Sequence, residues 1–164
     1  MILYEEIFRK FEEQGVKYII VGGMAVNIHG YIRATTDLDI LAEMADDNLA
    51  KIVNILKEEG YKVKQPVDPI VIANEETRRG WIENKNMKAF NFYKEDFFKE
   101  VDIIIESPIN FETALKTVCN YKISDLTLPV ISMDNLIKMK KGSARGIDKL
   151  DISLLRKIKG INGE

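Results

Sequence analysis

A short apolar strand, a glycine pair and a pair of aspartates follow one another near the start of this chain. Tyr18–Val21 is an uninterrupted apolar run that leads directly into Gly22 and Gly23. After a spacer of thirteen residues, Asp37 and Asp39 alternate with apolar side chains, which is the pattern of a strand. Residues two apart on a strand face the same way, so both carboxylates project side by side. The segment therefore predicts two strands, one followed by a glycine turn and the other carrying two acidic side chains.

Apolar periodicity along the rest of the chain predicts an α+β fold. We expect a mixed central β-sheet flanked by helices, with further helices at the C-terminus. The predicted helices cover residues 2–11, 22–28, 46–59, 75–84, 108–118, 132–141 and 147–159, with Asp46 or Asp47 and Ser132 as caps and Gly15, Gly60, Gly142 and Gly160 as stops. The predicted strands cover residues 18–21, 38–42, 61–64, 70–73, 87–93, 99–105, 121–124 and 126–131.

The composition is that of an ordinary globular protein. Apolar residues make up 46% and charged residues 30% of the 164 residues, and the formal net charge is −2. This balance provides no overall attraction to nucleic acid or membrane, and no apolar run approaches the ~20 residues of a membrane span. The single cysteine, Cys119, excludes an intramolecular disulfide. We therefore expect one cytoplasmic domain covering residues 1–164, with no targeting segment and no membrane contact.

The aspartate pair needs a compensating charge. Two carboxylates held ~7 Å apart or less beside an apolar strand repel each other and lose hydration. Mg²⁺ offsets both costs, because it binds carboxylate oxygens and commonly retains phosphate oxygens as further ligands. The glycine pair offers unpaired N–H groups at the start of a helix, where a phosphate group can bind. Phosphate on one side and a metal-binding carboxylate pair on the other indicate nucleoside triphosphate chemistry.

Asp102 is a third candidate metal ligand. It lies between Val101 and Ile103 in a run typical of an interior strand. A lone buried carboxylate costs several kcal/mol unless it is paired or bound to a metal. If its strand lies beside that of Asp37 and Asp39, three carboxylates converge on a site that could hold two metal ions ~3.5–4 Å apart. The structural alternative is an aspartate that is merely capped by a neighbouring N–H group or an arginine.

These motifs together resemble a known superfamily. Val21-Gly22-Gly23, the spacer, Asp37-Leu38-Asp39-Ile40 and the later Val101-Asp102-Ile103 are similar to the pattern of the DNA polymerase β-like nucleotidyltransferases. The C-terminal series of Lys138, Lys141 and Arg145-x-x-Asp148-x-x-Asp151 is similar to that of the minimal and toxin-type branches. The resemblance extends over about residues 15–158 and implies a nucleotidyltransferase fold.

The resemblance also implies roles for individual residues. Asp37, Asp39 and Asp102 would bind Mg²⁺, with two metal ions in the site, and Asp102 would help to deprotonate the acceptor hydroxyl. Gly22 and Gly23 would let the triphosphate of an NTP approach the backbone. The implied reaction is an in-line attack on the α-phosphate, in which a nucleoside monophosphate is transferred and pyrophosphate leaves.

Other candidates for nucleotide binding share a charged or hydrogen-bonding side chain; they are Arg33, Thr36, Lys138, Lys141, Arg145 and Asp151. Arg33 precedes the aspartate pair and could reach a phosphate or a base. Asp151 lies on or beside the apolar stripe of the last helix, so we expect it to pair with Lys138, Lys141 or Arg145 and to orient that cation toward phosphate. The alternatives are a surface arginine, solvated lysines and a purely structural ion pair.

Several classes of function fit these features. The leading hypothesis is Mg²⁺-dependent transfer of a nucleoside monophosphate to a hydroxyl of an RNA end, a protein side chain or a small molecule such as an aminoglycoside. A glycosyltransferase also uses an Asp-x-Asp pair, but such domains usually need a longer chain and no upstream glycine pair. The alternative from a different class is a non-catalytic nucleotide- or partner-binding scaffold of the same fold, for example in a toxin–antitoxin pair with an antitoxin-type partner.

Overall fold

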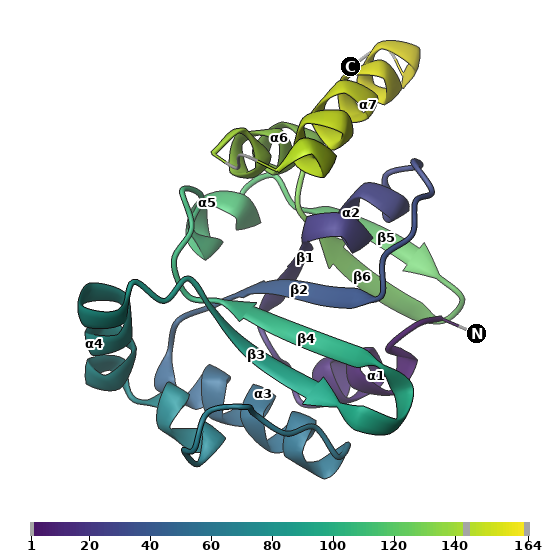
Figure 1. Ribbon diagram of the computed structural model, residues 1–164. Helices are drawn as coiled ribbons and strands as arrows, with labels where there is room; N and C mark the ends of the chain where they lie inside the picture. Colours follow the sequence, from purple (N-terminus) through teal and green to yellow (C-terminus); the bar gives the residue numbers. More distant parts are fainter. Residues whose placement is uncertain (1, 143–144, 163–164) are drawn as a thin grey trace.

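The computed structural model describes residues 2–142 and 145–162 and contains a six-stranded mixed sheet (Figure 1). Its strands are β1 (Tyr18–Val21), β2 (Asp37–Ala42), β3 (Ala89–Lys94), β4 (Lys99–Ile104), β5 (Cys119–Ile123) and β6 (Leu126–Val130). The order across the sheet is β3-β4-β2-β1-β6-β5. β2 pairs antiparallel with β1 and parallel with β4, while β1 pairs parallel with β6. The strand that carries the aspartate pair therefore lies in the middle of the sheet.

Helices lie on both sides of this sheet. They are α1 (Glu5–Glu13), α2 (Gly22–Ile28), α3 (Asp46–Glu58), α4 (Glu75–Lys85), α5 (Phe111–Leu115), α6 (Met133–Lys141) and α7 (Gly146–Asn162). In Figure 1, α1 and α3 lie below the sheet, and α2, α6 and α7 lie above it. α6 and α7 pack against each other at the end of the molecule opposite α3. This arrangement confirms the predicted α+β class with C-terminal helices.

The apolar positions of the central strands form the core. All four residues of β1 are buried, as are Leu38 and Ile40 of β2 and Val101 and Ile103 of β4. Side chains alternate along a strand, so burying these residues directs the acidic residues between them to the opposite face. No helix within residues 2–142 and 145–162 is both long and apolar enough to cross a membrane.

The two strands predicted at residues 61–64 and 70–73 are not formed. Pro69–Ala73 is instead a short 3₁₀ helix, in which the Asp68 side chain accepts a backbone N–H of the first turn. A proline has no N–H to donate to a strand ladder, and its fixed φ suits the first turn of a helix. In the earlier segment, Lys62 makes an isolated β-bridge to β3.

Several predicted helix ends were also wrong, and the helix predicted at residues 108–118 is reduced to α5 at Phe111–Leu115. The residue at the N-terminal cap of α3 is Ala45, and Asp46 and Asp47 lie in the first turn, where carboxylates interact favourably with the helix dipole. α7 continues through Gly160 to Asn162, because a glycine in a helix costs only about 1 kcal/mol and does not by itself end it. The other helix ends follow their caps more closely, since α6 begins directly after its predicted Ser132 cap.

Asn48 of α3 provides a test of how this fold is held together. Its buried side chain accepts the Lys17 N–H at 2.9 Å and donates to the carbonyl groups of Lys17 and Glu43 at 2.9 and 3.0 Å. We expect Asn48→Ala to lower the free energy of unfolding by about 2–3 kcal/mol, because these backbone groups lose a partner. Denaturant titration measures the loss. Asn54→Ala, at an exposed position of the same helix, should stay within about 0.5 kcal/mol of the wild type; equal losses in both variants would contradict the role of Asn48.

Candidate active site

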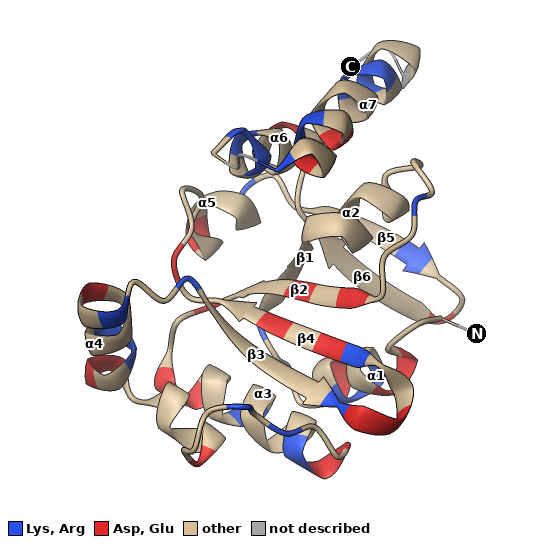
Figure 2. Ribbon diagram, viewed as in Figure 1, with Lys and Arg blue, Asp and Glu red and all other residues tan. Residues whose placement is uncertain are grey.

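The acidic residues of β2 and β4 lie side by side on one face of the sheet. The two strands are parallel neighbours, and their register places Asp39 opposite Asp102 and Asp37 opposite Glu100. Figure 2 shows the red segments of both strands next to each other. The strand of Asp102 therefore lies beside the strand of Asp37 and Asp39, as the convergence of three carboxylates requires. Glu100 lies on the same face as these aspartates.

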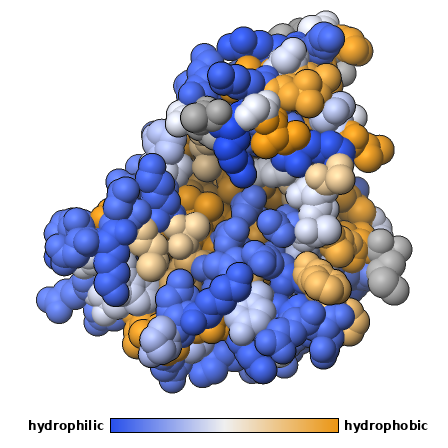
Figure 3. Space-filling model, in the orientation of Figure 1, coloured by the Kyte–Doolittle hydropathy of each residue, from blue (hydrophilic) through white to orange (hydrophobic). Residues whose placement is uncertain are grey.

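These aspartates line one side of a cavity of about 340 Å³. The other side comes from α6 and the start of α7 and carries Lys140, Arg145 and Asp148, and Gly22 lines the cavity where β1 meets α2. In Figure 3 the surface below the C-terminal helices is hollowed, with hydrophilic side chains around the hollow. A carboxylate wall facing a wall with two cations suits an anionic ligand that carries a metal cation with it.

Burial and repulsion change the acidity of these carboxylates. Desolvation raises the pKa of Asp39 to about 7, and the charges of Asp102 and Asp37 add to the rise, whereas Lys140 opposes it. Desolvation also raises the pKa of Asp37, with a contribution from Glu100. Both shifts arise because like charges share a poorly hydrated site. A cation bound between the carboxylates would remove this repulsion.

The two glycines leave space that neighbouring side chains of this protein occupy. Gly22 has a φ of +69°, and a Cβ there would lie 2.1 Å from Asp39 Oδ2. A Cβ on Gly23 would lie 2.7 Å from Arg33 Nη2 and 2.9 Å from Thr35 Oγ1. All three distances are shorter than Cβ contacts in proteins, so a Cβ would force these side chains to shift, and the positive φ of Gly22 independently favours glycine. The packing of the site thus requires Gly22, whereas a side chain at Gly23 would displace the ends of Arg33 and Thr35. The predicted role of both glycines in letting a triphosphate approach the backbone stays a prediction.

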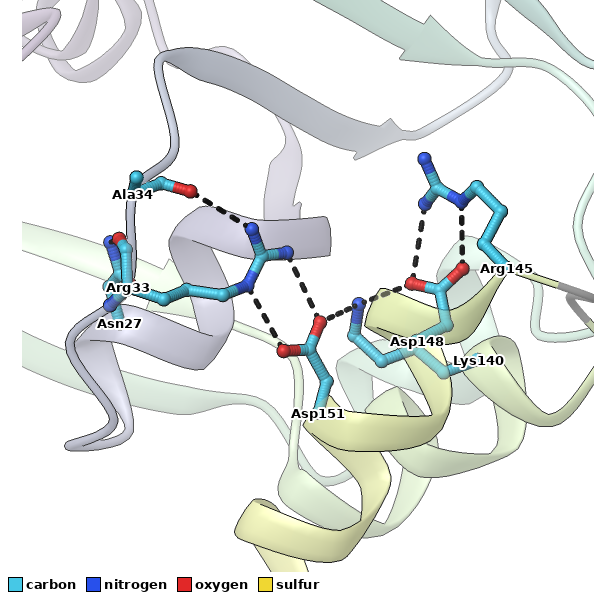
Figure 4. A network of polar contacts seen from close by, with 7 residues as sticks. All are labelled: Asn27, Arg33, Ala34, Lys140, Arg145, Asp148 and Asp151. Atoms are coloured by element: carbon cyan, nitrogen blue, oxygen red, sulfur yellow. Dashed lines mark hydrogen bonds and ion pairs between the residues drawn. The ribbon is translucent and has the colours of Figure 1, made fainter.

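Asp151 of α7 is fully buried and pairs with two cations from other parts of the chain (Figure 4). Arg33 Nε lies 3.0 Å from Asp151 Oδ1, and Arg33 Nη2 lies 3.1 Å from Asp151 Oδ2. Lys140 Nζ lies 2.9 Å from Asp151 Oδ2 and 3.1 Å from Asp148 Oδ1. Arg145 extends the network through two hydrogen bonds to Asp148. The network ties the loop before β2 to both C-terminal helices.

The expected cationic partners of Asp151 were therefore wrong. Lys138 and Lys141 are exposed on α6 and are not among the residues that line the cavity. Arg145 does line the cavity, but its guanidinium group bonds to Asp148 at 2.9 and 3.2 Å. The predicted partners failed because helical spacing alone does not tell which face of α6 turns toward α7.

Lys140 and Asp148 are cavity residues that we did not predict as part of the site. Lys140 continues the buried stripe of α6, at i+4 from Leu136 and i+7 from Met133. A lysine on such a stripe is almost never buried without a partner, so its position in the apolar pattern was the available signal. Asp148 is 2% exposed and follows Arg145 at i+3, a spacing that brings side chains together on a helix.

The buried face of α7 is not the apolar stripe that its sequence indicates. Asp148, Asp151 and Leu155 are buried, whereas Ile147 is 39% and Leu150 is 48% exposed. The helix is rotated so that its two aspartates meet the cations of the network. A buried cation without a counter-charge costs more than the exposure of part of an aliphatic side chain, which explains this rotation.

Thr36 lies beside the cavity and supports the strand of the aspartate pair. Its side chain is exposed and its hydroxyl donates a hydrogen bond to Asp37 Oδ1 at 3.3 Å. Its carbonyl group accepts a hydrogen bond from the buried Tyr4 hydroxyl, which in turn accepts the Glu100 N–H at 3.1 Å. Tyr4 therefore links the residue before β2 to the second residue of β4, and holds the two acidic strands together near their starts.

The donor set on these strands fits Mg²⁺. Asp39 and Asp102 present hard oxygen donors from neighbouring strands, and Asp37 presents a third from the same cavity wall. In the part of the chain that the structure describes, no three Asp, Glu, His or Cys side chains are grouped closely enough to hold an ion by themselves. Mg²⁺ is commonly held by one or two carboxylates together with the phosphates of a nucleotide. The site therefore suits a metal ion that binds together with its nucleotide.

Known structures define the class of protein to which this fold belongs. The lincosamide antibiotic adenylyltransferase LnuA, solved with lincomycin bound, matches with a TM-score of 0.63 at 20% sequence identity and covers 93% of both chains. The structure of ANT(2'')-Ia in complex with adenylyl-2''-tobramycin matches with a TM-score of 0.57 at 12% identity, over 98% of this chain and 93% of that chain. The fold is that of the nucleotidyltransferases.

A family model narrows this class. The model of the aminoglycoside-2''-adenylyltransferases matches residues 4–155. A sequence comparison with curated proteins found no match. Since the model matches nearly the whole chain, the chain belongs to the aminoglycoside-2''-adenylyltransferase family. It is a nucleotidyltransferase enzyme, and the resemblance to the polymerase β-like superfamily is confirmed.

Gly22→Ala tests whether the geometry of Asp39 depends on the glycine. The added Cβ would collide with Asp39 Oδ2, so we expect ATP binding in the presence of Mg²⁺ to weaken by about tenfold or more. Gly15→Ala is a matched control, since Gly15 has a φ of +66° and nothing lies within 4 Å of its added Cβ. Gly15→Ala should lose about 1–2 kcal/mol of stability, and Gly22→Ala should lose at least as much because of the added collision, both measured by thermal unfolding. Equal nucleotide affinity in the two variants would show that the contact with Asp39 is unimportant.

Asp151→Asn tests the buried network. Neutralising this carboxylate leaves Arg33 and Lys140 with too little counter-charge, so we expect the free energy of unfolding to fall by about 3–5 kcal/mol. Asp134→Asn is the matched control, because Asp134 pairs with Lys159 at an exposed site; its loss should stay below about 1 kcal/mol. Denaturant titration of both variants provides the comparison. Similar losses would mean that the network does not stabilise the fold.

Proposed function

We propose that this protein transfers an adenylyl group from ATP, with Mg²⁺, to a hydroxyl group of a small-molecule acceptor and releases pyrophosphate. The observation that carries the proposal is the register of β2 and β4, which sets Asp39 beside Asp102. Both residues line a cavity whose other side carries Lys140 and Arg145. The family description supports adenylyl as the transferred group. The lincomycin and adenylyl-tobramycin bound to two proteins of the same fold support a small acceptor over an RNA end or a protein side chain.

The residues of the cavity have distinct parts in this reaction. Asp37, Asp39 and Asp102 would hold the metal, and bound Mg²⁺ would neutralise charge on the phosphates. Asp102 accepts the proton of the acceptor hydroxyl. The hydroxyl oxygen attacks the α-phosphorus, and the bond between that phosphorus and the pyrophosphate oxygen breaks. Lys140 and Arg145 line the other side of the cavity, where they would stabilise the charge of the leaving pyrophosphate.

The other candidates for nucleotide binding either support the site structurally or lie outside the cavity. Arg33 and Asp151 satisfy each other's charge, so they act by holding α7 and Lys140 in place. Lys138 and Lys141 are exposed beside the cavity and can contact only ligand groups that extend out of it. Arg145 is the most adaptable cation of the cavity, because its side chain is 73% exposed.

Calorimetric titration with ATP, with and without Mg²⁺, tests the proposal on the wild type, on Asp39→Asn and on the control Asp68→Asn. Asp68 is 59% exposed and does not line the cavity. We expect ATP to bind the wild type and Asp68→Asn only when Mg²⁺ is present, and Asp39→Asn to lose at least about tenfold in affinity. Pyrophosphate release with a panel of aminoglycosides and lincosamides then tests the acceptor class.

The other outcomes point to different functions. Wild-type protein that binds no ATP with Mg²⁺, up to millimolar concentration (about 4 kcal/mol of affinity), would contradict the proposal and favour the non-catalytic scaffold. Retained transfer in Asp39→Asn would contradict the assigned metal site. ATP binding without pyrophosphate release from any small acceptor, together with labelling of RNA or protein by radioactive ATP, would contradict the acceptor class alone.

A further inference from the structure

Asn91 of the edge strand β3 contacts the carboxylate wall of the cavity. Its side-chain Nδ2 donates to Asp102 Oδ1 at 2.8 Å and to Glu100 Oε2 at 3.0 Å. Neither the sequence motifs nor the proposed mechanism assigns this asparagine a part. Its contact with Asp102 gives it direct influence on a residue that the proposed reaction uses twice, as a metal ligand and as a proton acceptor.

The contact follows from the register of the sheet. Asn91 is the backbone partner of Asp102 in the antiparallel pair of β3 and β4, and Asp102 is the partner of Asp39 in the parallel pair of β4 and β2. Val21 of β1 continues the same row as the partner of Asp39. The amide, the two carboxylates and the residue before Gly22 therefore lie in one line across four strands, and Val21, Asp39 and Asp102 of this line border the cavity.

The orientation of the amide is set by the two carboxylates. Asn91 Oδ1 is buried and has no hydrogen-bond partner among the residues that the structure describes. Turning the amide over would place this oxygen against Asp102 and Glu100, where acceptors would repel each other. The side chain thus directs its N–H groups to the acids even though its own oxygen lacks a donor.

A neutral donor is well suited to this place. The same wall already carries four carboxylates, and desolvation, together with repulsion among them, raises the pKa values of Asp37 and Asp39. A lysine or arginine would compete with a metal cation by neutralising the carboxylates, whereas an amide satisfies one oxygen of Asp102 without adding charge. The other oxygen of Asp102 stays available for a metal ion or for the acceptor proton.

We propose that Asn91 is a positioning residue, which orients the Asp102 carboxylate against Asp39 and so sets the geometry of the pair for a metal-bound nucleotide. This inference rests on the proposed function, since it concerns the same site. Asn91 itself touches neither nucleotide nor acceptor in this role. Its effect on metal-dependent binding passes entirely through Asp102.

Nucleotide binding tests this role without requiring an acceptor. The probe is α,β-methylene-ATP with Mg²⁺, titrated calorimetrically into the wild type, Asn91→Leu and Asn91→Ala, with thermal unfolding measured in parallel. Asn91→Leu keeps the bulk of the side chain and removes only its polar groups. Asn120→Ala is the matched control, because Asn120 lies exposed on the opposite edge strand β5. We expect both Asn91 variants to bind the Mg²⁺ complex about tenfold or more weakly than the wild type and the control.

A second comparison isolates the route through Asp102. Asn91→Leu should have no further effect on affinity when it is combined with Asp102→Ala, which removes the acceptor of the contact, because two residues that act through one contact are not additive. A full additional loss in the double variant would overturn the assigned route. Unchanged metal-dependent affinity in Asn91→Leu and Asn91→Ala, whatever their melting temperatures, would overturn the inference and leave the proposed function standing. A wild type without metal-dependent binding would overturn both.

Discussion

The repulsion between Asp39 and Asp102 is the constraint on which the rest of this structure depends. Their strands are parallel neighbours in register, so the two carboxylates cannot separate without a shift of the sheet. A shift by one residue would turn Leu38 and Ile40 out of the core and is therefore excluded by burial. Burial of the apolar face of the sheet provides the free energy that holds these like charges together. A bound cation or a proton on Asp39 would relieve this repulsion.

The C-terminal helices are attached to this acidic sheet by charge as well as by apolar contacts, since Leu136 and Leu155 belong to the hydrophobic core. Asp151 joins Arg33 of the loop before β2 to Lys140 of α6, and Asp148 joins Lys140 to Arg145. Such buried pairs contribute little net stability compared with apolar contacts, but breaking one is costly. The network therefore favours a single placement of α6 and α7. That placement brings a pair of cations to face the carboxylates across the cavity.

The two sides of the cavity divide the proposed work between them. The strands supply the acidic groups for a metal and for the proton of the acceptor, while the helices supply cations for the leaving pyrophosphate. The supports behind each wall, Asn91 and Tyr4 on the strands and Arg33 with Asp151 on the helices, come from segments far apart in the sequence. The acceptor is not specified by these groups, because one fold with one metal site serves many acceptors.

Much of the fold and the first half of the site could be predicted because the signals are local. An uninterrupted apolar run identifies β1, and alternation of apolar and polar residues identifies β2 and β4. The spacing of Gly22, Asp37 and Asp39 points to the site before any contact is known. Prediction was wrong where prolines interrupt apolar runs at residues 61–73, since a short apolar run with missing N–H donors suits a 3₁₀ turn as well as a strand.

The sequence by itself determined the class of fold, the pair of acidic residues on β2 and the third on β4, because periodicity and spacing are properties of contiguous residues. Only the tertiary structure decided that Asp151 pairs with Arg33 and Lys140, that α7 turns its aspartates inward and that an asparagine of β3 holds Asp102. The physical reason is that the partners of charged and amide groups depend on which groups lie close to them and on how deeply they are buried. Those conditions exist only after distant segments have packed together.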